Sequence, residues 1–153
     1  MKGWPGPLAR RFQQIAVAVF HAEVGASGSD LTPVQFAALW EIQSHPGIDQ
    51  ATLAGLIAFD RTTISGVVDR LLQKGFITRK VRKEDRRARV LEITREGDDL
   101  LAAVTPAVAK AQRVMLSGLD ENEAAELVRL LNKAVAALND LSRAPLQEEL
   151  GGQ

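Results

Sequence analysis

Apolar residues recur at helical spacing near both ends of the chain. One stripe, at intervals of three or four residues, consists of Leu8, Phe12, Ile15 and Val19. This spacing places them on one face of a helix, which the glycines at 25–28 end. Near the other end, a stripe at similar spacing runs through the long apolar side chains of residues 127–141. The chain therefore is predicted to begin and end with amphipathic helices.

Capping residues mark three helices in the middle of the chain. Thr32 followed by Pro33 is typical of a helix start. Asp49 is expected to cap a short helix and Asp60 a longer one, with Gly75 as its C-terminal left-handed residue. Two short helices joined by a turn of a few residues are a candidate helix-turn-helix.

A β-hairpin is predicted directly after this motif. Residues 77–81 and 89–93 are rich in β-branched side chains, and the charged segment 82–88 separates them. A helix-turn-helix followed by a hairpin is a winged helix. The predicted fold class is therefore mainly α (α+β), a winged helix-turn-helix with long N- and C-terminal helices.

Two more helices follow the hairpin. Thr94 is expected to cap a long helix that contains Pro106, which should kink it or mark its weakest turn. Asp120 and Glu123 have the spacing of a capping box at the start of the last helix.

These terminal helices carry more apolar surface than one DNA-binding unit needs, and we expect them to pack against a second copy. The predicted organisation is one domain, 1–153, in which 30–94 form a DNA-binding lobe. Residues 8–28 and 95–142 then form the dimerisation helices.

Composition narrows the class of protein. The chain has 153 residues, of which 46% are hydrophobic and none is cysteine. Disulfides and thiolate zinc sites are therefore excluded. The apolar run at 15–20 is too short to cross a bilayer, and no signal-peptide layout precedes it. We expect a protein of the cytoplasm with no membrane partner.

The distribution of charge points to nucleic acid, although the chain as a whole has no net charge. Residues 61–89 hold ten Arg or Lys against three Asp or Glu, a net charge of +7. A basic segment between acidic arms is typical of a local phosphate-binding face. The alternative is a charged loop that only meets solvent.

Candidate DNA-binding residues are short hydroxyl side chains and cations on the helix-turn-helix and the hairpin. They are Thr52, Arg61, Thr62, Thr63, Ser65, Arg70, Lys80, Arg82, Arg86, Arg87 and Arg89. Asp85 is expected to pair with a nearby arginine and so to aim Arg87 into a minor groove. The competing interpretations are ordinary capping chemistry at the helix start and a solvated turn with a local ion pair.

The sequence resembles the MarR family, the multiple-antibiotic-resistance-regulator group of winged-helix proteins. The matching segments are 31–36 (LTPVQF), 60–63 (DRTT), 68–71 (VDRL), 74–77 (KGFI), 85–89 (DRRAR) and 91–97 (LEITREG). The resemblance implies a homodimer held by the first and last two helices and bound to a near-palindromic operator. It also implies a repressor that a small ligand releases from DNA.

A segment at 8–14 resembles the branch of the family that responds to aromatic acids or their coenzyme A thioesters. Candidate ligand-binding residues are Arg10, Arg11, Phe12, Phe36, Trp40 and Met115, with the arginines facing a carboxylate or phosphates. Each apolar one could equally be core packing. No cofactor is expected, and the two histidines do not have metal-site spacing.

Two other classes of function remain open. A winged helix can serve as a protein-interaction module without binding DNA, although such a module has no need for a basic hairpin. An enzyme is the weakest alternative, because no set of nucleophile, base and orienting group is recognisable.

Overall fold

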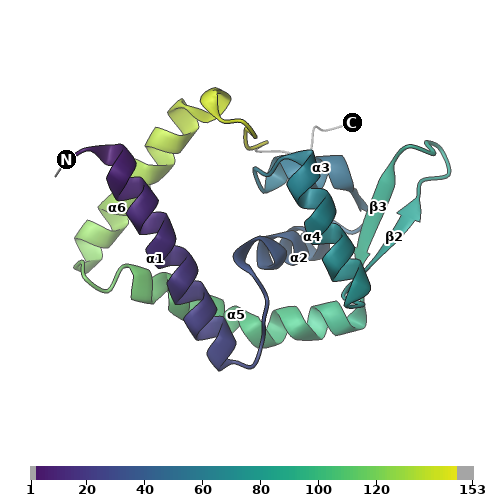
Figure 1. Cartoon of the computed structure of the whole chain (residues 1–153), viewed down its shortest axis with the longest axis horizontal. Coiled ribbons are helices and arrows are strands. Elements are labelled where there is room, and N and C mark those ends of the chain that lie inside the picture. Colours follow the sequence, from purple (N-terminus) through teal and green to yellow (C-terminus); the bar gives the residue numbers. More distant parts are fainter. Residues whose placement is uncertain (1–2, 148–153) are drawn as a thin grey trace. The chain divides into compact units, whose positions relative to one another are not determined.

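The computed structural model describes residues 3–147, which form a mainly helical structure with one small sheet (Figure 1). The helices are α1 (Pro5–Ala26), α2 (Pro33–Ser44), α3 (Gln50–Leu56), α4 (Arg61–Gln73), α5 (Arg95–Met115) and α6 (Glu121–Ala137). The strands are β1 (Ile48–Asp49), β2 (Ile77–Val81) and β3 (Arg89–Ile93), and a 3-10 turn, η1 (Asn139–Leu141), follows α6. The predicted fold class is confirmed.

The chain divides into two compact units. One contains the described residues up to Pro33 together with Ala102–Leu131. The other contains Val34–Leu101 together with the described residues from Asn132 onward. The helix-turn-helix and the hairpin both lie in the second unit. The division predicted from the sequence, a lobe at 30–94 with dimerisation helices on either side, stays a prediction.

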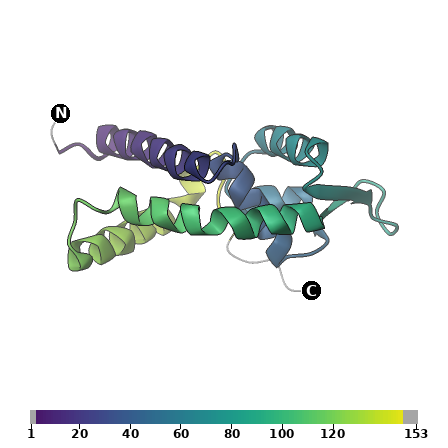
Figure 2. The same cartoon turned by 90° about the horizontal axis from the view of Figure 1, so that it is seen from below.

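The core of the second unit is made by the inner faces of α2, α3 and α4 and by the sheet. The fully buried side chains there are Leu39, Ile42, Leu53, Ile64, Val68, Leu71 and Leu91. The hairpin of β2 and β3 projects beyond the helices of its unit in both views (Figures 1 and 2). It therefore presents its cations to solvent.

The sheet has three strands, in the order β1-β3-β2, where the sequence predicted two. Ile48 pairs with Leu91 and Asp49 with Val90, both antiparallel. A strand of two residues is too short to show alternation in sequence, which is why it was missed. Because β1 leads directly into α3, this pairing attaches the start of the helix-turn-helix to the middle strand of the sheet.

Thr94 joins the end of α4, the start of β2 and the start of α5. Its N–H donates to the carbonyl of Phe76 (3.0 Å), and its hydroxyl donates to the carbonyl of Gly75 (2.7 Å). The same hydroxyl accepts the N–H of Gly97 (3.1 Å), so Thr94 caps α5 as predicted. A Cβ on Gly97 would overlap the Phe76 carbonyl, and glycine is required by this close approach. Gly75 has a φ of 77°, the left-handed conformation expected after α4.

In the first unit, the C-terminal half of α1 is the packed half. Phe20 and Val24 are buried with Leu31 of the following loop and with the inner face of α5, Val104, Val108 and Ala111. An ion pair between Lys110 Nζ and Glu23 Oε2 (2.7 Å) also joins these helices. The N-terminal half of α1 is exposed, including Leu8 and Ile15 of the predicted stripe.

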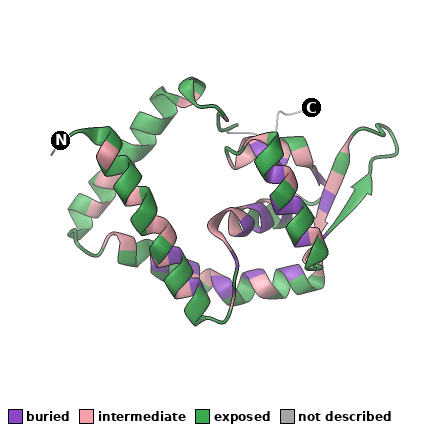
Figure 3. Cartoon of the chain, in the orientation of Figure 1, coloured by how far each residue is buried: buried purple, intermediate pink, exposed green. Residues whose placement is uncertain are grey.

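Within residues 3–147, the apolar face of α6 is left exposed (Figure 3). The helix begins with the predicted capping box, in which Asp120 and Glu123 each accept the other's N–H. It contains no buried residue. Its exposed large apolar side chains are Val128, Leu130, Leu131 and Val135, with Leu138 and Leu141 following. No helix within residues 3–147 is long and apolar enough to span a membrane.

Candidate nucleic-acid interface

The two helices of the helix-turn-helix begin with the same polar box. Asp49 accepts the N–H of Thr52 (2.8 Å) and its hydroxyl (2.6 Å) at the start of α3. Asp60 accepts the N–H of Thr63 (2.8 Å) and its hydroxyl (2.8 Å) at the start of α4. Each carboxylate therefore satisfies an N–H group that a helix start leaves without an intrahelical partner.

These bonds also stabilise the charged form of both carboxyl groups. Burial opposes ionisation of Asp49, but the Thr52 hydroxyl and N–H, together with the charge of Arg82, outweigh it and lower the pKa. The N–H and then the hydroxyl of Thr63 lower the pKa of Asp60. Because Asp60 holds a negative charge at the start of α4, this helix presents Arg61 rather than its bare N-terminus to an approaching anion.

The boxes change what the two predicted threonines can offer to DNA. The hydroxyl protons of Thr52 and Thr63 are donated within the chain, so these side chains can only accept further hydrogen bonds. Arg61 and Thr62 lie exposed in the first turn of α4, and Gly66 carries no side chain on the same helix. DNA contacts by all of these residues stay predictions.

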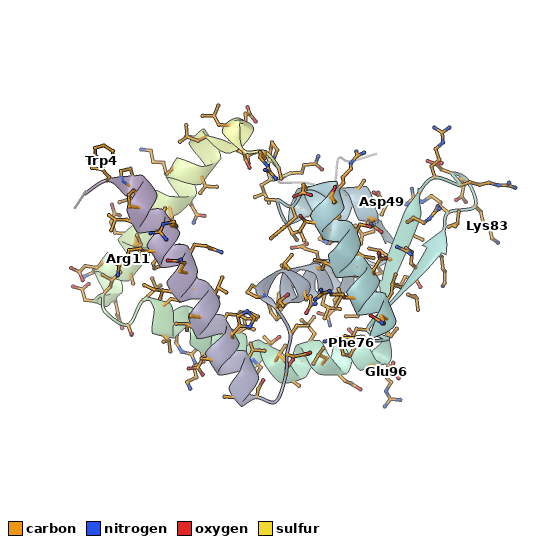
Figure 4. The ribbon with its side chains drawn as sticks, viewed as in Figure 1. Trp4, Arg11, Asp49, Phe76, Lys83 and Glu96 are labelled. Carbon is orange, nitrogen blue, oxygen red and sulfur yellow. The ribbon has the colours of Figure 1, made fainter. Side chains whose placement is uncertain are left out.

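The tip of the hairpin is a tight turn made by backbone contacts. The N–H of Ala88 donates to the carbonyl of Asp85 (3.0 Å), and the N–H of Arg87 donates to the Asp85 carboxylate (2.9 Å). The expected ion pair between Asp85 and an arginine side chain is therefore wrong for the described chain. A short aspartate at the first position of a turn captures the backbone N–H two residues on, before it can reach a guanidinium. Asp85 thus shapes the turn that carries Arg87, and Lys83 is exposed near the tip (Figure 4).

Cations from α4 and the hairpin line one hollow of about 300 Å³. Its lining residues are Asp49, Gln50, Ala51, Arg61, Ile64, Arg79, Arg87, Ala88 and Arg89. Arg89 is fixed by a hydrogen bond from its guanidinium to the carbonyl of Arg86 (2.8 Å). The buried Oε1 of Gln50 has no hydrogen-bond partner in the described part of the chain. Three of the predicted arginines, Arg61, Arg87 and Arg89, therefore gather around one concave surface.

Arg82 lies at a second hollow, beside Asp49 and Thr52. Its N–H donates to the carbonyl of Ala88 (3.1 Å), which closes the base of the turn. Of the remaining predicted residues, Ser65 is half-buried, whereas Arg70 and Arg86 are exposed.

Two ion pairs of the hairpin were not predicted. Arg79 Nη1 lies 3.2 Å from Asp69 Oδ1, which ties β2 to α4. Lys80 Nζ lies 3.1 Å from Glu92 Oε2 on the neighbouring strand, so this predicted DNA contact already has a carboxylate partner. The pair of Arg79 and Asp69 could have been suspected from the sequence. In a strand, Arg79 lies on the same face as Ile77, two residues earlier, and Ile77 is buried.

The predicted ligand residues fall into two groups. Arg10 and Arg11 line a shallow hollow on α1 with Gln14, Ile15 and Ala18, and Arg10 donates to Gln14 (3.3 Å). Phe12 and Met115, in the same unit, are half-buried.

Phe36 and Trp40 belong to the other unit, where their ring centroids lie 6.0 Å apart. A single pocket made by all six residues stays a prediction. Among the described residues, no group of three or more His, Asp or Glu side chains could hold a metal ion.

A capped helix-turn-helix beside a cation-bearing hairpin defines the class of winged-helix DNA-binding regulators. The sequence pattern described as the MarR family matches residues 31–88. The chain is 30% identical over 130 residues to the HTH-type transcriptional repressor NicR of Pseudomonas putida, covering 85% of this chain and 81% of that protein. The chain belongs to the MarR family.

Two solved structures are similar along most of their length. The PcaV transcriptional regulator of Streptomyces coelicolor, in complex with its natural ligand, is 31% identical, with a TM-score of 0.81 over 89% of this chain and 94% of that one. BpsR of Bordetella bronchiseptica, whose DNA binding is regulated by 6-hydroxynicotinic acid, is 26% identical. Its TM-score is 0.81 over 88% of this chain and 94% of that one. The protein is a transcriptional regulator and not an enzyme.

Removal of the Asp49 carboxylate should destabilise the protein in a pH-dependent way. Asp49→Ala is expected to lower the free energy of unfolding by about 1 kcal/mol at neutral pH, because an N-cap is lost. The folded-state pKa of Asp49 is lowered from 3.8, so its contribution is present above that value and is lost as the pH falls through the folded pKa.

Urea unfolding at several pH values measures this difference. Asp99→Ala, an exposed carboxylate on α5, is the matched control and should unfold like the parent. A difference between Asp49→Ala and the parent that stays constant from neutral pH to below pH 3.8 would contradict the assignment.

Proposed function

We propose that this protein is a homodimeric repressor that binds a near-palindromic operator and leaves it when an aromatic acid, or its coenzyme A thioester, binds. The observation that carries the DNA-binding part is the shared hollow, in which Arg61 of α4 meets Arg87 and Arg89 of the hairpin. Arginine forks at a concave surface suit phosphate and base-edge recognition. The protein acts on DNA in the cytoplasm.

Each part of this surface has a separate role. Arg61, Thr62 and Thr63, in the first turn of α4, enter the major groove, with Ser65 in the next turn. Arg87 enters the adjacent minor groove from a turn that Asp85 shapes. Arg70, Arg82, Arg86 and Arg89 contact phosphates, which position the protein without reading the sequence. Lys80 contributes least, because it already pairs with Glu92.

A protein-interaction module is the less favoured alternative. A cluster of arginines would repel most partners other than acidic ones, and NicR is named as a transcriptional repressor. A DNA-binding regulator and a protein-interaction module differ in the salt dependence of binding. DNA binding releases counterions from the phosphates and therefore weakens steeply as the salt concentration rises.

The dimer is supported by the uncovered apolar face of α6. Val135 and Leu138 are 60% and 58% exposed in the single chain, and Leu8 on α1 is 56% exposed. Apolar side chains at helical spacing on both terminal helices are suited to an interface between two copies. A two-fold dimer presents its two reading helices to half-sites roughly 10 bp apart.

The ligand part is supported by the relatives and by the arginine pair on α1. PcaV was solved with its natural ligand, and 6-hydroxynicotinic acid regulates the DNA binding of BpsR. Among the described residues, Arg11 has no hydrogen-bond or ion-pair partner, and it shares its hollow with Arg10. A carboxylate or a thioester phosphate would satisfy these guanidinium groups, and Phe12 and Met115 of the same unit offer apolar side chains to the aromatic ring. A ligand that binds the DNA-free arrangement more tightly shifts the protein off its operator.

Loss of single arginines should weaken operator binding in different ways. Arg61→Ala should cost about 1–3 kcal/mol and relax the sequence preference, because a base contact is lost. Arg87→Ala should weaken binding with a smaller change in major-groove preference. Arg129→Ala is the matched control, because Arg129 pairs with Glu126 on α6. Fluorescence anisotropy on operator and mutated half-sites measures both effects, and Arg87→Ala binding as tightly as the parent would refute the role of the hairpin.

A charge on the apolar face of α6 should separate the dimer. The parent is expected to scatter light as twice the 16.6 kDa chain at micromolar concentration. Leu131→Glu buries a carboxylate in the interface and should give a monomer. Asn132→Glu, its exposed neighbour with the same change in charge, should remain dimeric. A monomeric parent, or a dimeric Leu131→Glu variant, would exclude α6 from the interface.

An aromatic acid should release the protein from its operator. 4-Hydroxybenzoic acid, 6-hydroxynicotinic acid and 4-hydroxybenzoyl-coenzyme A are titrated against the protein–operator complex, and at least one should release it at millimolar concentration or below. Arg11→Ala should raise the concentration needed, whereas Arg113→Ala, an exposed arginine on α5, should not. If no probe acts, the ligand class is wrong. If a probe acts equally on Arg11→Ala, only the role of Arg11 is wrong.

A further inference from the structure

The segment after α6 turns back onto the helix-turn-helix of its own unit. We call residues 139–147 the C-terminal strap. The Asn139 side chain closes it into a loop, because its amide donates to the carbonyl of Leu146 (3.0 Å) and its oxygen accepts the N–H of Leu146 (2.8 Å). The N–H of Gln147 then donates to the carbonyl of Gly55 (3.0 Å), at the end of α3. The strap is therefore closed on itself and attached to the first helix of the motif (Figure 1).

Gly55 provides the place where the strap is attached. It lies in the last turn of α3, and its carbonyl accepts both the N–H of Ala58 (3.3 Å), in the turn after the helix, and the N–H of Gln147 from the strap. A Cβ at this position would overlap the Gln147 side chain. The atoms it would meet are the end of a flexible side chain, so Gly55 marks a close approach of the strap to α3.

Arg143 lies in the strap between Asn139 and Leu146, which close it into a loop, and it is exposed. The pKa of Asp60 is lowered first by the N–H and hydroxyl of Thr63, then by the N–H of Thr62, and last by the positive charge of Arg143. The strap thus brings Arg143 into the electrostatic neighbourhood of the N-terminus of α4, the reading helix of the proposed function.

This position matters because Asp60 places a negative charge at the start of that helix. A DNA phosphate that approaches the first turn of α4 meets this carboxylate, which already accepts the N–H and hydroxyl of Thr63. A nearby guanidinium offsets the repulsion and offers forked donors to a phosphate. Arg61 alone supplies positive charge in the first turn of α4 itself.

We propose that Arg143, presented by the C-terminal strap, is a further DNA-binding residue that contacts a backbone phosphate beside the N-terminus of α4. The proposal rests on the proposed operator binding and adds a phosphate contact to it. Phosphate contacts position a protein on DNA without reading sequence, so Arg143 contributes equally to binding of operator and of unrelated DNA.

The test is the salt dependence of DNA binding by Arg143→Ala. The slope of log K against log salt should be reduced by about 0.9 per chain, or about 1.8 for a dimer that loses two phosphate contacts. Affinity for operator and for scrambled DNA should fall by the same factor. Arg143→Lys keeps the charge and should keep most of the slope, and Arg129→Ala is the control elsewhere in the chain.

Asn139→Ala tests whether the strap is what places Arg143. It removes both bonds to Leu146 and should reduce the slope as Arg143→Ala does, while thermal unfolding followed by circular dichroism shows that the fold remains. A slope unchanged in Asn139→Ala would overturn the role of the strap.

Operator binding and the Arg143 contact are distinguished by different outcomes. If the parent binds DNA and Arg61→Ala weakens it, but Arg143→Ala keeps the parent's affinity and slope, the Arg143 proposal is overturned and operator binding stands. If the parent shows no salt-dependent DNA binding, the proposed function itself fails, and the role of Arg143 fails with it.

Discussion

The hydrogen bonds of Thr94 are the constraint on which the arrangement of the DNA-binding unit depends. One side chain and its N–H hold the carbonyls of Gly75 and Phe76, while the same hydroxyl caps α5 at Gly97. The end of the reading helix, the first strand of the hairpin and the start of the long helix α5 are therefore fixed at one point.

The distribution of charge on the DNA-binding unit depends on which carboxylates are already bound to nearby groups of the chain. Carboxylates are used to cap helices or to pair within the hairpin, as at Asp49, Asp60 and Glu92. Arg61, Arg87 and Arg89, which have no carboxylate partner among the described residues, line the hollow between α4 and the hairpin. The chain has no net charge, yet positive charge is concentrated on one surface. The carboxylates cap helices, form ion pairs or lie on the other helices.

The pair of Arg79 and Asp69 has a different purpose from the exposed arginines. It joins the hairpin to the reading helix at 3.2 Å, and such an exposed pair adds little to stability. It links β2 to α4 directly, at the base of the hairpin.

The sequence by itself determined the elements of the DNA-binding unit. Caps at Asp49, Asp60 and Thr94, the glycine at Gly75 and the alternation of 77–81 and 89–93 act over a few residues, so they could be read without tertiary contacts. The position of the basic segment was readable for the same reason, because charge is carried by residue type.

Only the tertiary structure decided which groups meet. The strand β1, the attachment of Gln147 to Gly55 and the pairing of Arg79 with Asp69 join residues that are distant or too few to leave a pattern. The Asp85 carboxylate was assigned to an arginine side chain from charge alone, whereas turn geometry gave it to a backbone N–H. Local sequence patterns indicate the propensity to form helices, strands and turns. The partner of a polar group depends instead on which donor the folded chain brings within about 3 Å, and that is decided by the packing of the whole unit.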